Sequence, residues 1–145
     1  MEFMDLLENN ALMAAILAWF IAQVIKVVLV FFEEKRFDLT KMISSGGMPS
    51  SHSALITAMT ASVGKTAGFD SVAFAIAAVT SLVVMYDAAN VRREAGKHAE
   101  LLNKIARDLY PDNQINQEKL KELLGHKLIE VVAGALLGIT VGILL

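Results

Sequence analysis

Four apolar runs, separated by charged or glycine-containing stretches, organise the chain. The first covers residues 11–32, and polar side chains interrupt it only at Gln23 and Lys26. Its 22 residues, as a helix rising 1.5 Å per residue, span about 33 Å, enough to cross a bilayer. The other runs cover about residues 51–67, 71–87 and 127–145. No stretch alternates with the period of a strand, so the pattern predicts an all-α chain with four membrane spans.

The stretch between the third and fourth runs carries most of the charge and has a different pattern. Apolar residues recur there at helical spacing, at Leu101, Leu102, Ile105 and Leu109, before Pro111 breaks the pattern. A second short helix is expected after a cap at Asn116, with Leu120, Leu123 and Leu124 on one face. Residues 93–125 are therefore predicted to form a helical hairpin at the membrane surface.

Composition supports a single membrane domain covering residues 1–145. Hydrophobic residues make up 55% of the chain and the mean hydropathy is +0.54, which is too apolar for an ordinary soluble domain. The absence of cysteine excludes disulfides, thiolate metal sites and a cysteine nucleophile. The first ten residues carry three acids and no lysine or arginine, so we expect a mature N-terminus without a signal peptide. The net charge of −2 gives no sign of nucleic acid, and no such partner is expected.

Basic residues are distributed unequally between the two sides of the predicted up-down-up-down bundle. Lys65 is alone on the side of the 65–70 turn and the termini, and Lys26 lies within a span. The other eleven of the thirteen Lys and Arg fall on the opposite side, at Lys35, Arg36, Lys41, Arg92, Arg93, Lys97, Lys104, Arg107, Lys119, Lys121 and Lys127. The positive-inside rule places that side in the cytoplasm. We therefore expect a protein of a bacterial-type inner membrane, with the hairpin in the cytoplasm and both termini on the other side.

Lys26 is a cation inside an apolar run, about two turns from the cytoplasmic end of the first span. One interpretation is that it extends along the helix to the headgroups. The favoured one is that it faces the interior of the bundle, as ionisable residues in spans usually do, with Gln23 on the same helix face.

The segment GGMPSSHSA, residues 46–54, precedes the second span. Its glycines, Pro49 and serines are typical of a helix start, and the first-turn amides there can bind an anion. Ser50 and Ser51 can add hydroxyl donors, and His52 would lie beside the anion. A plain helix cap with an interfacial histidine explains the same residues equally well.

Two further clusters lie at the cytoplasmic ends of the third and fourth spans. Arg92 and Arg93 can grip phosphate in the bidentate way that guanidinium allows, or they can simply be positive-inside charges. His126 and Glu130 are four residues apart and share a helix face, so the carboxylate can orient the imidazole. The alternative is a helix-end pair without chemistry.

All these clusters meet at one side of the membrane if the topology is right. Two histidines, a carboxylate, several cations and an anion-binding helix start are the parts needed for phosphoryl transfer through a phosphohistidine. This chemistry requires no metal or other cofactor, so none is expected.

The same residues resemble a known family. Pro49-Ser50-Ser51-His52 resembles the Pro-Ser-Gly-His motif of the type 2 phosphatidic acid phosphatases, which are relatives of the vanadium haloperoxidases. His126-x-x-x-Glu130 resembles their His-x-x-x-Asp. Together with VRREAG, these motifs look like the divergent membrane branch of that superfamily.

The resemblance implies a role for each residue. His126 would be the nucleophile, Glu130 its orienting carboxylate and His52 the proton donor, while Ser50 and Ser51 would help to hold phosphate. The family's first motif, a lysine with Arg-Pro seven residues later, matches poorly, because Glu33 stands seven after Lys26. Lys26 or Arg36 is then the surviving phosphate ligand. The family's Ser-Arg motif is interpreted as split by the hairpin, which assigns its arginine to Arg92 or Arg93.

The expected function is a membrane lipid phosphatase that hydrolyses a lipid phosphomonoester at the cytoplasmic face. The alternative is a non-catalytic protein of the same fold that binds or translocates a lipid phosphate; a purely structural bundle fits less well with the polar residues in spans. The expected partners are the lipid phosphate and membrane lipids. A homodimer is left open, because a stripe at Gly134, Gly138 and Gly142 suits close helix packing, either between chains or, as we favour, within the bundle.

Overall fold

Every regular element in the described part of the chain is a helix. The computed structural model describes residues 6–35, 47–109 and 127–145. Its elements are α2 (Asn10–Glu34), α3 (Ser51–Ala67), α4 (Val72–Tyr86), the π-helix η2 (Asp87–Val91), α5 (Arg92–Leu109) and α6 (Leu128–Leu144). The all-α prediction is confirmed for these ranges. The four predicted apolar runs coincide with α2, α3, α4 and α6 to within two residues at either end.

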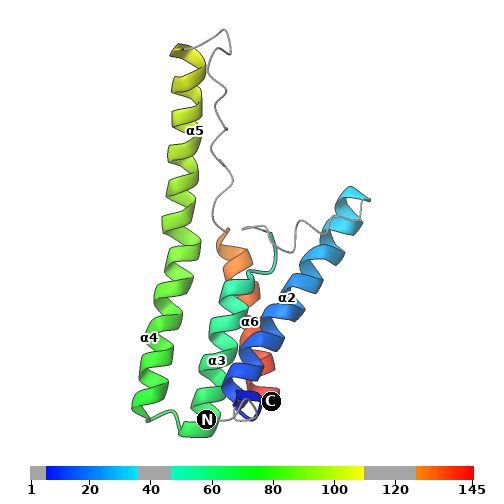
Figure 1. Cartoon of the computed structure of the whole chain (residues 1–145), viewed down its shortest axis with the longest axis vertical. Helices are drawn as coiled ribbons and strands as arrows, with labels where there is room; N and C mark the ends of the chain where they lie inside the picture. The colour runs from blue at the N-terminus through cyan, green and yellow to red at the C-terminus, as the bar shows by residue number, and fades with distance from the viewer. Residues whose placement is uncertain (1–5, 36–46, 110–126) are drawn as a thin grey trace.

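Helix α3 lies at the centre of the arrangement (Figure 1). It packs against α2, α4 and α6, and α2 also contacts α6. In Figure 1, α2 and α4 run towards one end of the bundle and α3 and α6 run back. Two helical stretches are long and apolar enough to cross a membrane, Asn10–Phe32 and Val72–Asp108, and α6 is a shorter apolar helix. Four spans that alternate across a membrane remain a prediction.

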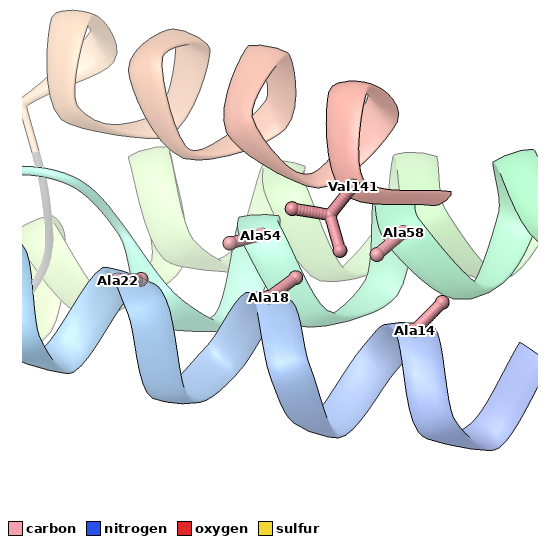
Figure 2. Close-up of a cluster of buried hydrophobic side chains, with 6 residues drawn as sticks. All are labelled: Ala14, Ala18, Ala22, Ala54, Ala58 and Val141. Carbon is pink, nitrogen blue, oxygen red and sulfur yellow. The ribbon is translucent and has the colours of Figure 1, made fainter. Parts of the chain in front are cut away.

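Small side chains form the centre of the bundle (Figure 2). Ala14, Ala18 and Ala22 follow one another every four residues along one face of α2 and meet Ala54 and Ala58 of α3. Val141 of α6 packs against the same cluster. Large apolar side chains point outward instead, as Ile76, Val79 and Leu82 do on α4. Small residues between helices with large apolar residues outside are typical of a bundle packed in lipid.

The glycine stripe of α6 packs against α3 within the same chain. A Cβ added at Gly134 would collide with the backbone oxygen of Ser50, and one at Gly138 with the backbone oxygen of Ala54. Gly142 meets the Ala58 carbonyl in the same way. The Thr57 hydroxyl adds a hydrogen bond of 3.1 Å to the Ala135 carbonyl across this contact. Of the two interpretations of the stripe, packing within the bundle is the one that the structure shows, so a homodimer would have to use another surface.

Helices α4, η2 and α5 form one long rod that extends well beyond the rest of the bundle (Figure 1). The Asp87 N–H bonds to the carbonyls of Val83 and Val84, so helical hydrogen bonding continues beyond the end of α4, towards the residues predicted to begin the surface hairpin. The first half of the predicted 93–125 hairpin is therefore a helix in line with α4. Its second half, residues 110–126, lies outside the described residues, and the hairpin remains a prediction.

Candidate functional site

Lys26 is buried inside the bundle, with only 2% of its surface exposed. It continues the row of Ala14, Ala18 and Ala22 by one helical turn. Gly47 lies directly beside its stem: a Cβ on Gly47 would be 3.4, 3.5 and 3.8 Å from Cγ, Cδ and Cε of Lys26. Gly47 has a positive φ of 88°, a conformation that favours glycine. The structure thus shows the favoured inward orientation of Lys26.

Glu130 links the start of α3 to the start of α6 through two hydrogen bonds. Its backbone carbonyl accepts a hydrogen bond of 2.9 Å from the Ser50 N–H. Its carboxylate Oε2 accepts one of 3.1 Å from the Lys127 N–H, so the side chain caps α6. The charges of Glu130 and Lys26 are close enough to interact. We refer to Lys26, Gly47, Ser50 and Glu130 as the Lys26 cluster; three segments far apart in sequence build it.

The start of α3 shows one of the two roles that the sequence left open, the helix cap, and anion binding there stays a prediction. Ser50 is fully buried, and its Oγ accepts hydrogen bonds from the Ser53 N–H (3.3 Å) and the Ser53 hydroxyl (3.0 Å). This oxygen is therefore a helix cap, as the plainer interpretation held. Ser51, 4% exposed, follows it. The first-turn amides of any helix lack carbonyl partners in their own helix and carry partial positive charge, so this end of α3 is suited to an anion.

His52 is exposed and lies on a different side of α3 from Ser50. It shares a helix face with Ile56 and Thr60, four and eight residues later. The Ser81 hydroxyl of α4 donates a hydrogen bond of 3.2 Å to the Ile56 carbonyl and lies 2.7 Å from the Thr60 hydroxyl. His52 is thus at the same helix start as the Lys26 cluster, but on the side that faces α4.

The side chains of the other predicted site residues lie outside the described part of the chain. His126 and Arg36 lie outside the described residues, as do the side chains of Arg92 and Arg93. The backbone of Arg92 and Arg93 opens α5 immediately after η2, and η2 contacts α6. In sequence, His126 directly precedes Lys127, the residue whose N–H bonds to Glu130. The catalytic and phosphate-binding roles of these residues remain predictions.

Sequence reasoning missed two features near this end of the bundle. One is the π-helical turn η2, and π-helical turns are frequent at functional sites. The other is the contact between Gly47 and the stem of Lys26. The Gly-Gly pair at 46–47 was a signal of unusual backbone angles, but it could not identify the side chain that packs there.

Comparison with known proteins now gives the family. The family model described as "Divergent PAP2 family" matches residues 7–141. The chain is also 41% identical over 153 aligned residues to the "Uncharacterized membrane protein YuiD" of Bacillus subtilis (strain 168), covering 98% of this chain and 97% of the relative. No solved structure matches. The chain belongs to the Divergent PAP2 family, as its motifs indicated.

Proposed function

We propose that the protein is a membrane lipid phosphatase that acts at the end of the bundle where the Lys26 cluster lies. The observation that carries the proposal is Lys26 itself, a lysine buried beside a helix start in a chain of the Divergent PAP2 family. A buried cation needs an anionic partner, and a phosphate at the start of α3 would meet both the ammonium group and the helix amides. Among the described residues, the negative charge that acts on Lys26 is that of Glu130.

The proposed reaction has two steps. A nitrogen of His126 attacks phosphorus, an N–P bond forms, and the P–O bond to the lipid breaks while His52 gives its proton to the leaving oxygen. A water molecule, deprotonated by His52, then attacks the phosphohistidine and releases inorganic phosphate. Lys26, the α3 amides and one or both of Arg92 and Arg93 stabilise the charge on the phosphoryl oxygens in both steps.

The proposed setting is a membrane crossed by α2, α3, α4 and α6, with the Lys26 cluster towards the cytoplasm. The candidate spans, the outward-facing large apolar side chains and the name of the Bacillus relative support the membrane location. The concentration of Lys and Arg at this end supports the orientation. The substrate would then be a lipid phosphomonoester of the inner leaflet.

One observation favours the non-catalytic alternative. The Ser50 hydroxyl oxygen and one Glu130 carboxylate oxygen are both engaged in helix caps, which is a structural use of two residues with predicted roles in the reaction. Lys26 and the α3 amides suffice to bind a lipid phosphate, whereas turnover needs the histidines.

Phosphate release from purified protein separates the two functions. The substrates are phosphatidic acid, phosphatidylglycerophosphate and a polyprenyl phosphate, and the variants are His126→Ala and His52→Ala. His98→Ala is the matched control, since His98 is exposed on α5 and is the one histidine of the chain without a proposed role in the reaction. We expect release to be abolished in His126→Ala with lipid binding retained, to be reduced in His52→Ala, and to be unchanged in His98→Ala. Binding without release by the folded wild-type protein would establish the alternative.

A further inference from the structure

Gln23 carries a buried carboxamide oxygen that the described part of the chain leaves without a donor. The residue is 5% exposed, and its Oε1 has no hydrogen-bond partner among the described residues. An unsatisfied buried acceptor of this kind destabilises the folded protein. A polar side chain held in such a place, within an otherwise apolar helix, indicates that a donor arrives from outside the described residues.

Gln23 lies one helical turn from the buried cation of the proposed site. It precedes Lys26 by three residues on α2, so the two side chains are neighbours on the helix surface, about 4.5 Å apart along the axis. Both are buried in the same bundle. A ligand whose phosphate contacts Lys26 therefore brings its adjoining atoms within reach of Gln23.

The chemistry of the amide oxygen restricts what it can bind. It only accepts hydrogen bonds, and the oxygens of a phosphate dianion only accept as well, so the two do not pair. A hydroxyl group donates. The complementary ligand for a lysine ammonium and an amide oxygen one turn apart is a phosphate ester with a free hydroxyl on a carbon close to the phosphate.

We propose that Gln23 is a specificity-determining residue whose Oε1 accepts a hydrogen bond from such a hydroxyl, so that the protein prefers lipid phosphomonoesters with a free hydroxyl next to the phosphate. The inference rests on the proposed function, because it takes the phosphate to be held at Lys26. A site built to bond a hydroxyl rejects the analogue that lacks it, since the buried polar group is then left unpaired.

A matched pair of lipids tests this proposal. Oleoyl lysophosphatidic acid and its 2-deoxy analogue, oleoyl propanediol phosphate, differ by one hydroxyl. Their dissociation constants are measured with the full chain carrying His126→Ala, so that neither lipid is turned over. We expect the hydroxylated lipid to bind about tenfold more tightly, in line with one hydrogen bond to a buried acceptor.

Gln23→Met keeps the length of the side chain and removes the acceptor. We expect it to abolish the preference while the deoxy lipid binds as before. Ser62→Ala is the matched control. Ser62 is also fully buried with a hydroxyl unpartnered among the described residues, but it lies eleven residues beyond Ser51 on α3, about 16 Å along the axis, so the preference should persist.

Each contrary result has a distinct meaning. Equal binding of the two lipids, or a preference that survives Gln23→Met, overturns the role of Gln23. A loss of affinity for both lipids in Gln23→Met would mean that the donor is the P–OH group of the phosphate, and the proposed substrate class would be wrong. If neither lipid binds, the failure is that of the proposed phosphate site.

Stability of the ligand-free protein provides a second measurement. Because Gln23→Met removes an unsatisfied acceptor, we expect the Tm of the free protein to rise by a few degrees, about 2–4 °C. A lower Tm would show that Gln23 already has a donor in the free protein, and would overturn the proposal.

Discussion

A lysine lies near each end of α3, and the two lysines are held in opposite ways. At the C-terminal end, Lys65 donates a hydrogen bond of 3.0 Å from its Nζ to the Ile143 carbonyl while its side chain remains exposed. At the N-terminal end, Lys26 of α2 is buried against Gly47 and close to the charge of Glu130.

The difference separates a structural cation from one that is suited to a ligand. Lys65 meets the last turn of α6, where carbonyls without helical partners carry partial negative charge. The hydrogen bond from Lys65 to the Ile143 carbonyl therefore explains the position of this lysine without any ligand. Lys26 is removed from water near the end of α3 that presents its first amides, and the opposing charge that acts on it among the described residues is that of Glu130. The hydrogen bond of Lys65 links α3 to α6, whereas the buried charge of Lys26 would attract an anion.

The largest expected effect comes from a substitution that separates α3 from α6, because this contact holds the two ends of α3 in place alike. Gly138→Leu would force a side chain into the Thr57 hydroxyl and the Ala54 carbonyl, in the middle of the α3–α6 contact. Since backbone cannot move aside cheaply, we expect a loss of more than about 3 kcal/mol of stability, measured as loss of folded protein in detergent. Thr140→Leu, which places the same leucine side chain on the exposed face of α6, is the control. A Gly138→Leu protein as stable as this control would contradict the observed packing.

Substitutions of Glu130 should have the second-largest effect, because they act only on the end of the bundle where the Lys26 cluster lies. Glu130→Ala removes the acceptor for the Lys127 N–H, and we expect a cost of about 1–2 kcal/mol in chemical denaturation. Glu130→Gln keeps an oxygen there and should recover most of this loss. If the two variants were equally unstable, the charge near Lys26, not the cap, would be what stabilises this end.

Two serine caps, one near each end of α3, offer a matched pair of substitutions. The Ser50 hydroxyl caps α3 at the site end, and the Ser71 hydroxyl caps α4 at the other end by accepting from the Phe74 N–H at 3.1 Å. Each alanine variant should cost about 1 kcal/mol of stability. Only Ser50→Ala should also weaken lipid-phosphate binding, measured by titration. Equal binding by the two variants would limit Ser50 to its cap.

Lys65→Met should have the smallest effect. The hydrogen bond to Ile143 is exposed, so we expect a loss of about 0.5 kcal/mol in thermal unfolding. A loss as large as that of Glu130→Ala would mean that Lys65 is more than a cap for α6.

The helices could be predicted from the sequence because their boundaries are local. Ser50 after Pro49 marks the start of α3 and Gly68 marks its end, and the structure has α3 at Ser51–Ala67. The burial of Lys26 was also predictable, since its position in an apolar run leaves few other options. These features depend on residues near one another in the chain.

The rest depends on contacts that no local pattern contains. The glycine stripe of α6 had two equally regular uses, and only its register against Ser50, Ala54 and Ala58 decides between them. The sequence predicts a separate surface hairpin from about residue 93, yet α4 continues through η2 into α5. Nothing in the sequence reveals that Gln23 Oε1 lacks a hydrogen-bond partner among the residues that the structure describes.

The most direct test of the central claim, that the Lys26 end is a phosphate site, compares the two lysines in one binding experiment. The dissociation constant for phosphatidic acid in nanodiscs is measured for the wild-type protein, Lys26→Met and Lys65→Met. The account predicts that Lys26→Met weakens binding by at least about tenfold, because a charged hydrogen bond to phosphate is lost, and that Lys65→Met leaves it unchanged. A Lys26→Met protein that folds and binds as tightly as the wild type would contradict it.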